Sequence, residues 1–245
     1  MKILLFGATG QLGREVARQA LAAGHALSVA VRQPARLQAP AAPGAWAAVH
    51  TVDLEQATAG ELAALMDGQA AVINAAGYVT DGERFEQLFA RVVEAAGQTA
   101  APQPVLWMLA GAALLELGET GRLGVDLPVV GTRYSAHRRN WHRLQATRLD
   151  WRLLCPGPMV EHPAFGLEHM QVLIDRLPLG WPGWARHLPA AALLPAFVAR
   201  VPTITVPYAD AAALLLAHLE PGDPVSRRRV GLALPLGRRL HKRTD

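Results

Sequence analysis

Three glycines near the start of the chain have the spacing of a turn that binds a diphosphate. Gly7, Gly10 and Gly13 recur every third residue within GATGQLG, after the apolar run 3–6 and before the helix-forming run 14–23. Without a Cβ, such residues accept positive φ and let backbone N–H groups reach a pyrophosphate. The helix that follows presents its positive end to that charge. Strand, glycine turn and helix together predict a dinucleotide-binding loop; the alternative is a tight turn without a ligand.

We expect the cofactor to contact most of this turn. The predicted contacts within it are Gly7, Thr9, Gly10, Gln11, Leu12 and Gly13.

Arginine, not an acid, follows the second predicted strand, about 20 residues past the glycine turn, where an NAD site places its ribose-binding carboxylate. Arg32 stands there with Arg36 close behind, and a guanidinium can grip a 2′-phosphate that a carboxylate would repel. Asp53 comes too late in the chain to replace the missing acid. We therefore favour NADP(H), with NAD(H) possible; the alternative is that Arg32 is only a solvated loop cation.

The elements around these residues must form an α/β fold. Strands predicted at 2–6, 26–31, 48–52, 70–74, 105–109 and 151–155 alternate with helices at 12–23, 60–66, 84–96 and 134–148. This alternation predicts a Rossmann-type, doubly wound parallel sheet with helices on both faces and ligands at the carboxyl ends of the strands. We expect one domain over 1–245, with a cofactor-binding core at 1–158 and a small substrate-side extension at 159–245.

The chain resembles atypical short-chain dehydrogenase/reductases, above all the NmrA-like and biliverdin-reductase-B/flavin-reductase-like NAD(P)-binding proteins. The opening KILLFGATGQLGREVARQAL carries most of the likeness, and VDL at 52–54, VINAAG at 72–77 and LDWRLLCPGP at 149–158 follow in the family's order. The resemblance implies that Asp53 and Leu54 lie along the adenine ring. It also implies that the turn Asn74, Ala75, Ala76 and Gly77 borders the nicotinamide side. The alternatives are a helix N-cap role for Asp53 and a packing role for the alanines.

The superfamily's catalytic device is a Tyr-x-x-x-Lys pair on one helix face, with a Ser on the preceding strand. Here Tyr134 is followed four residues later by Arg138, and the segment 109–112 offers no hydroxyl. We expect Tyr134 and Arg138 to be the catalytic pair if carbonyl chemistry occurs, although an ordinary, partly buried tyrosine is the alternative. A flavin- or quinone-like acceptor needs mainly alignment over the nicotinamide. His162 could line such a pocket or lie on a surface loop.

Other features limit the partners and the compartment. Cys155 is the one cysteine, which excludes an internal disulfide and favours a buried, inert thiol. The histidines have no zinc spacing, so no metal is expected. The apolar segment 177–202 is broken by proline and too short to span a bilayer, so a pocket lid or a homodimer contact fits it better.

The basic residues near the end of the chain have no interleaved aromatic residues, so we expect a solvated tail and no nucleic-acid partner. The chain shows no secretory signal, and the expected location is the cytoplasm.

These features favour an NAD(P)H-dependent reductase of a small carbonyl or conjugated substrate. The alternative from another class is a non-catalytic, NmrA-like NADP sensor, which the incomplete catalytic set supports. A nucleotide-sugar epimerase is a weaker third possibility.

Overall fold

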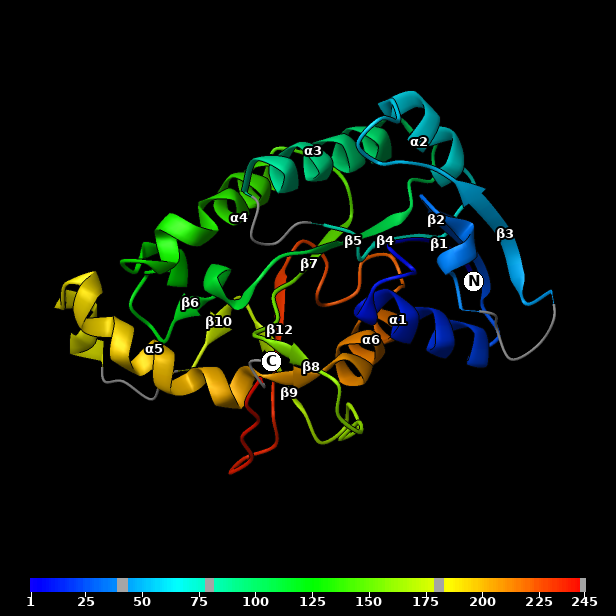
Figure 1. The fold of residues 1–245 in the computed structure, drawn as a ribbon. Helices are drawn as coiled ribbons and strands as arrows, with labels where there is room; N and C mark the ends of the chain where they lie inside the picture. Colours follow the sequence, from blue (N-terminus) through cyan, green and yellow to red (C-terminus); the bar gives the residue numbers. More distant parts are fainter. Residues whose placement is uncertain (39–43, 78–81, 179–182, 243–245) are drawn as a thin grey trace.

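An eight-stranded sheet forms the centre of the computed structural model, which describes residues 1–38, 44–77, 82–178 and 183–242 (Figure 1). The strands are β1 (Lys2–Phe6), β2 (Ala26–Val31), β3 (Trp46–Thr51), β4 (Ala71–Asn74), β5 (Val105–Leu109), β7 (Trp151–Leu154), β9 (Gln171–Ile174) and β12 (Arg229–Ala233). Their order is β3-β2-β1-β4-β5-β7-β12-β9, and every neighbouring pair is parallel except β12 with β9. The inner strands are nearly continuous apolar runs, as strands covered on both faces require.

Helices cover both faces of this sheet (Figure 1). On one face α1 (Gln11–Ala22) packs against α6 (Tyr208–Ala217), and on the other α2 (Ala59–Met66), α3 (Gly82–Gln98) and α4 (Val130–Gln145) lie side by side. Each face has its own apolar core. The expected Rossmann-type arrangement is confirmed.

The amphipathic pattern of α3 explains how that helix is placed. Its side chains at i, i+3, i+4, i+7 and i+8 are all buried; they are Phe85, Leu88, Phe89, Val92 and Val93. Such a stripe must face the sheet.

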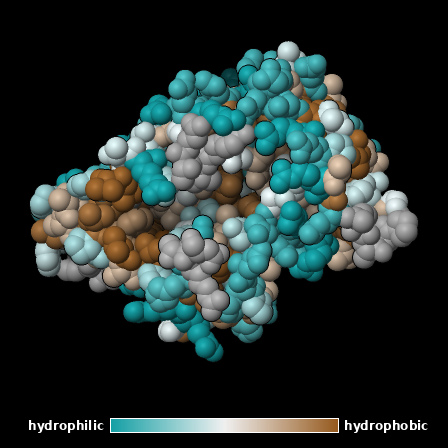
Figure 2. Space-filling view, in the orientation of Figure 1, coloured by the Kyte–Doolittle hydropathy of each residue, from teal (hydrophilic) through white to brown (hydrophobic). Residues whose placement is uncertain are grey.

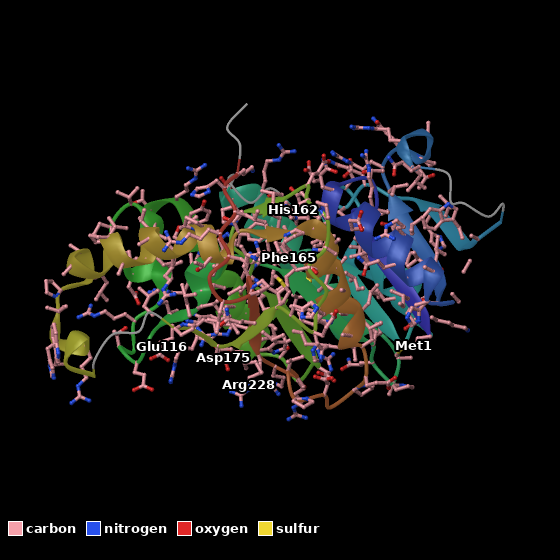
Figure 3. All side chains as sticks on the ribbon, turned by 90° about the horizontal axis from the view of Figure 1, so that it is seen from below. Met1, Glu116, His162, Phe165, Asp175 and Arg228 are labelled. Atoms are coloured by element: carbon pink, nitrogen blue, oxygen red, sulfur yellow. The ribbon has the colours of Figure 1, made fainter. Side chains whose placement is uncertain are left out.

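The last third of the chain completes the sheet as well as covering its edge. β12 pairs in parallel with β7, and β9 pairs with β12 in the antiparallel sense. Asp175, just after β9, accepts hydrogen bonds from the Arg228 side chain at 2.9 Å and from the Arg229 backbone at 3.0 Å (Figure 3). This carboxylate therefore ties the turn after β9 to the start of β12.

Much of the segment 177–202 folds as one helix. Helix α5 (Ala190–Ile204) contains Pro195 and Pro202 and takes in Thr203 and Ile204, although the residues 203–206 alternate in the sequence like a short strand. The strand there is the two-residue β11 (Val206–Pro207), which pairs with β8 (Met159–Val160). A short 3₁₀ turn, Gly183–His187, precedes α5. Among the described residues, no helix is long and apolar enough to cross a membrane.

The connection before α4 contains several short elements. It contains 3₁₀ turns at Ala112–Leu114 and Gly124–Asp126, and the strand β6 (Glu116–Leu117), which pairs with β10 (Arg176–Leu177). Helix α4 begins at Val130, four residues before the predicted start, but Tyr134 within it has non-helical angles of φ −120° and ψ 19°. The predicted helix start at 134 thus coincides with a kink. A further 3₁₀ turn, Pro34–Arg36, follows β2.

Candidate functional site

A cavity of about 250 Å³ lies at the carboxyl ends of β1 to β4. The chain crosses from β1 to β2 on one side and reaches β4 on the other, so this is the switch point at which open α/β sheets bind ligands. Nine of the predicted cofactor contacts line it: Gly7, Thr9, Gly10, Arg32, Asp53, Leu54, Ala75, Ala76 and Gly77.

The glycine turn has no room for side chains at two positions. Gly7 has φ +81°, and a Cβ there would stand 2.6 Å from the backbone nitrogen of Ala76. A Cβ on Gly13 would collide with the carbonyl oxygen of Gly7. The turn is thus packed between α1 and the end of β4, with its backbone at the cavity wall.

The N-terminus of α1 lacks the groups that usually satisfy a helix start. Gly10 is its N-cap, no side chain caps it, and no acidic residue lies in the first turn. Free N–H groups and the helix dipole favour an anion at this point. The glycine turn and the start of α1 together fit a diphosphate.

Charged residues meet at the end of β2. Arg32 lines the cavity, but Asp53 and Glu55 line it too. The distance of Asp53 along the sequence therefore does not keep it away from Arg32. The Glu55 carboxylate accepts a 2.7 Å hydrogen bond from the Arg84 guanidinium of α3. This ion pair offsets the charge of Glu55. Arg36 lies exposed in the turn Pro34–Arg36 and is not among the described lining residues.

The third strand leads to an apolar slot whose walls include Val31, Val52, Leu54 and Leu88. Asp53 stands beside it and accepts a hydrogen bond from the Glu55 backbone at 2.9 Å. The alternative that Asp53 is a helix N-cap is wrong, because Thr58 caps α2 in a reciprocal pair with Glu61.

The other predicted contacts act around the cavity rather than on its wall. Asn74 is 3% exposed, and its side-chain oxygen accepts a hydrogen bond from the Ala76 backbone at 3.1 Å, which shapes the turn after β4. Leu12 is buried in the core beneath α1. Gln11 donates to Glu161 at 2.6 Å and joins α1 to the segment after β8.

A second cavity, of about 550 Å³, opens at the carboxyl ends of β5 and β7. Its floor is formed by the strand ends and the loops after them, at 109–113 and 156–159. Its walls come from α4, α5 and the start of α6, including Tyr134, Phe197, Ile204 and Tyr208. Since β4 and β5 are neighbours, the two cavities share one edge of the sheet.

Comparisons with known proteins agree with this geometry. Residues 7–175 match the family model described as NAD(P)H-binding. The chain belongs to this NAD(P)H-binding family of atypical short-chain dehydrogenase/reductases. No curated protein matches the chain by sequence.

Solved structures show the same fold at low sequence identity. A candidate NADH-flavin reductase from Streptococcus pneumoniae is 20% identical, with 96% of this chain and 99% of that chain covered and a TM-score of 0.67. A Rossmann-fold NAD(P)-binding family protein from Shigella flexneri is 17% identical, with 100% and 99% covered and a TM-score of 0.65. An oxidoreductase from Lactococcus lactis is 17% identical, with 96% and 91% covered and a TM-score of 0.67.

The predicted catalytic pair, Tyr134 and Arg138, does not line one cavity. Tyr134 lines the second cavity, whereas Arg138 is not among its described lining residues and forms an ion pair with Asp126. The other oxygen of Asp126 accepts a hydrogen bond from the Leu123 backbone at 2.7 Å. Arg138 thus ties α4 to the turn Gly124–Asp126.

A histidine that the sequence did not single out for catalysis lies directly behind Tyr134. His137 is 1% exposed, its ring is 5.5 Å from that of Tyr134 and 4.9 Å from that of Phe85, and neither ring nitrogen has a hydrogen-bond partner among the described residues. Burial lowers the pKa of His137 to about 4. The ring is therefore neutral at physiological pH.

One residue of the second cavity that the sequence did not single out is Tyr208, which comes from a distant part of the chain. Tyr208 lines the second cavity. Its pKa is raised by burial and, to a smaller extent, by the charge of Glu161.

His162 does not line the second cavity; it is exposed and stacks on Phe165 with ring centroids 5.2 Å apart (Figure 3). Cys155 is buried, as expected, and burial raises its thiol pKa.

Proposed function

We propose that this protein is an NADP(H)-dependent oxidoreductase that transfers a hydride to a small carbonyl-bearing or conjugated acceptor. The observation that carries the proposal is the pair of neighbouring cavities at one sheet edge. The first has the crowded glycine turn on its wall, which supports dinucleotide binding there, and the second is largely apolar. When bound, the coenzyme supplies the hydride, and the acceptor occupies the cavity over β5 and β7.

Preference for the phosphorylated coenzyme rests on Arg32. Its side chain stands at the end of β2 in the lining of the first cavity. Of the two acids that line this cavity, Asp53 and Glu55, Glu55 is paired with Arg84. A guanidinium at this position favours NADP(H). NAD(H) remains the alternative coenzyme.

The roles of Tyr134 and Arg138 differ in this proposal. Tyr134 lines the acceptor cavity and donates a proton to a carbonyl oxygen as the hydride arrives. Arg138 is a positioning residue, since it holds the turn Gly124–Asp126 against the helix that carries Tyr134. With a quinone- or flavin-like acceptor, protonation can come from solvent.

The test is turnover of NADPH by the purified protein with separate panels of quinones, flavins and enals or ketones, followed at the nicotinamide absorbance. We expect turnover with at least one panel. Tyr134→Phe should lower kcat at least about 10-fold for carbonyl acceptors and leave quinone reduction unchanged. Coenzyme binding without turnover of any acceptor would contradict the proposal and favour the NADP sensor.

Two further expectations from the sequence remain predictions. Figure 2 shows apolar surface in the region of α5. Val198 of this helix is 56% exposed. A homodimer through 177–202 would bury it, and Val198→Glu should then convert a dimer to a monomer in light scattering. Wild-type protein that is monomeric would contradict this expectation. The cytoplasmic location is likewise a prediction.

A further inference from the structure

The charged side chains of the acceptor cavity are all of one sign. Its described lining residues include Arg133 and Lys242 but no aspartate or glutamate. The rest of the lining is apolar except for Tyr134, Tyr208 and the backbone of the strand ends. In a cavity of this kind, the apolar part of a ligand can pack against the apolar lining, and a negatively charged group can bind the two cations.

Arg133 is available for such a contact. It precedes Tyr134 at the kink of α4, and its guanidinium carbon lies 5.8 Å from the centre of the Tyr134 ring. No ion pair joins it to a described residue, whereas Arg138 and Arg139 of the same helix are paired with Asp126 and Glu86. Arg133 is thus the cation of this helix stretch whose charge no described carboxylate offsets.

Lys242 reaches the same cavity because the end of the described chain is fastened to α5. The Leu234 backbone N–H donates to the Thr203 carbonyl at 2.8 Å, and the Leu240 N–H donates to the Pro202 carbonyl at 2.9 Å. These bonds fix the path of the basic tail, and Lys242 is among the described residues that line the cavity. No ion pair joins Lys242 to a described residue. At least this part of the tail belongs to the site.

We propose that the acceptor is an amphipathic anion: an apolar, conjugated body that carries a carboxylate, sulfonate or phosphate, held by Arg133 and Lys242. Its description as an acceptor rests on the proposed function; the binding of such an anion does not. Charge-assisted hydrogen bonds to a carboxylate are about twice as strong as neutral ones. The two cations therefore set specificity, and the apolar lining supplies the remaining contacts.

The experiment measures binding rather than turnover. Naphthoate and its neutral isostere naphthamide are titrated calorimetrically into the full-length protein saturated with NADP⁺. We expect naphthoate to bind at least about 10-fold more tightly than naphthamide. Arg133→Gln and Lys242→Gln should each weaken naphthoate binding about 10-fold, leave naphthamide binding unchanged, and reduce the salt dependence of naphthoate binding. Arg133→Lys should restore most of the lost affinity.

Matched control variants separate local contacts from overall charge. Arg139→Gln changes a cation on the same helix that is paired with Glu86, and Arg239→Gln changes a tail cation outside the described lining. Both should bind naphthoate like the wild type. Equal affinity for the two probes, or equal losses in the control variants, would overturn the inference.

The two proposals fail in different ways. Turnover of neutral quinones without a preference for naphthoate would refute the anion site and leave the oxidoreductase standing. Charge-selective binding of naphthoate without turnover of any acceptor would refute the oxidoreductase and leave the anion site standing.

Discussion

The two cavities share one sheet edge but are built from the chain in different ways. The first cavity, which we call the cofactor cavity, lies at the carboxyl ends of β1 to β4. Its lining residues fall between positions 7 and 88, most of them at the ends of successive strands. The acceptor cavity over β5 and β7 draws on residues 109–242, including α4, α5, α6 and the tail. Short motifs at successive strand ends, such as the glycine turn, can therefore encode the cofactor cavity. The acceptor cavity depends on tertiary packing, so its chemistry can vary while the fold stays the same.

The largest expected effect concerns the glycine turn of the cofactor cavity. Gly13→Ala places a Cβ against the Gly7 carbonyl. Because the contact is with backbone, no side chain can move aside and the turn must open. NADPH binding should weaken at least about 1,000-fold, equal to about 4 kcal/mol. Gly97→Ala in α3, where a Cβ meets nothing within 4 Å, is the control. Calorimetry measures the binding, and circular dichroism checks that both variants fold. Normal affinity in Gly13→Ala would show that the turn does not hold the diphosphate.

A second prediction concerns the buried ring behind the acceptor cavity. The pKa of His137 is about 4 in the folded protein and about 6.5 when unfolded, so the unfolded chain binds more protons between these values. The stabilising contribution of the neutral His137 ring should therefore be complete above pH 6.5. As the pH falls toward 4, the free energy of unfolding should decrease by up to about 3 kcal/mol because of this group.

Denaturant unfolding at a series of pH values tests this contribution. His137→Phe should remove most of that slope, while His142→Gln, at an exposed position of the same helix, should retain it. An unchanged slope in His137→Phe would contradict the assignment.

The third prediction asks whether the end of β2 selects the coenzyme. Arg32→Asp should weaken NADPH binding by about 10- to 100-fold and leave NADH binding unchanged or improved, because a carboxylate repels the 2′-phosphate. Arg36→Asp, outside the described lining, should have a much smaller effect. Dissociation constants for both coenzymes measure this preference. Equal losses for NADPH and NADH would reject the phosphate-binding role.

The same contrast explains what the sequence could reveal. The alternation of apolar strands with helices predicted the sheet and its covering, because burial on both faces dictates composition. The glycine turn and the strand ends predicted most of the cofactor cavity. The acceptor cavity could not be assembled in this way: Tyr134, Tyr208 and Lys242 are far apart in the chain and share no spacing. The residues Thr203 and Ile204 alternated like a strand, yet tertiary packing of α5 overrode that local pattern.

The smallest expected effect concerns Arg138, where family pattern and geometry disagree. If Arg138 replaced the family's lysine, its loss would weaken coenzyme binding and lower kcat by orders of magnitude. The ion pair with Asp126 instead indicates a positioning role at a partly exposed site, which is worth about 0–1 kcal/mol. Arg138→Ala should therefore lower kcat no more than about 5-fold, with the NADPH dissociation constant unchanged. Asp126→Asn should produce the same small loss, because it breaks the same contact from the other side. A loss of about 100-fold confined to Arg138→Ala would return this residue to the catalytic machinery, and the acceptor cavity would then be less dependent on distant parts of the chain than its lining indicates.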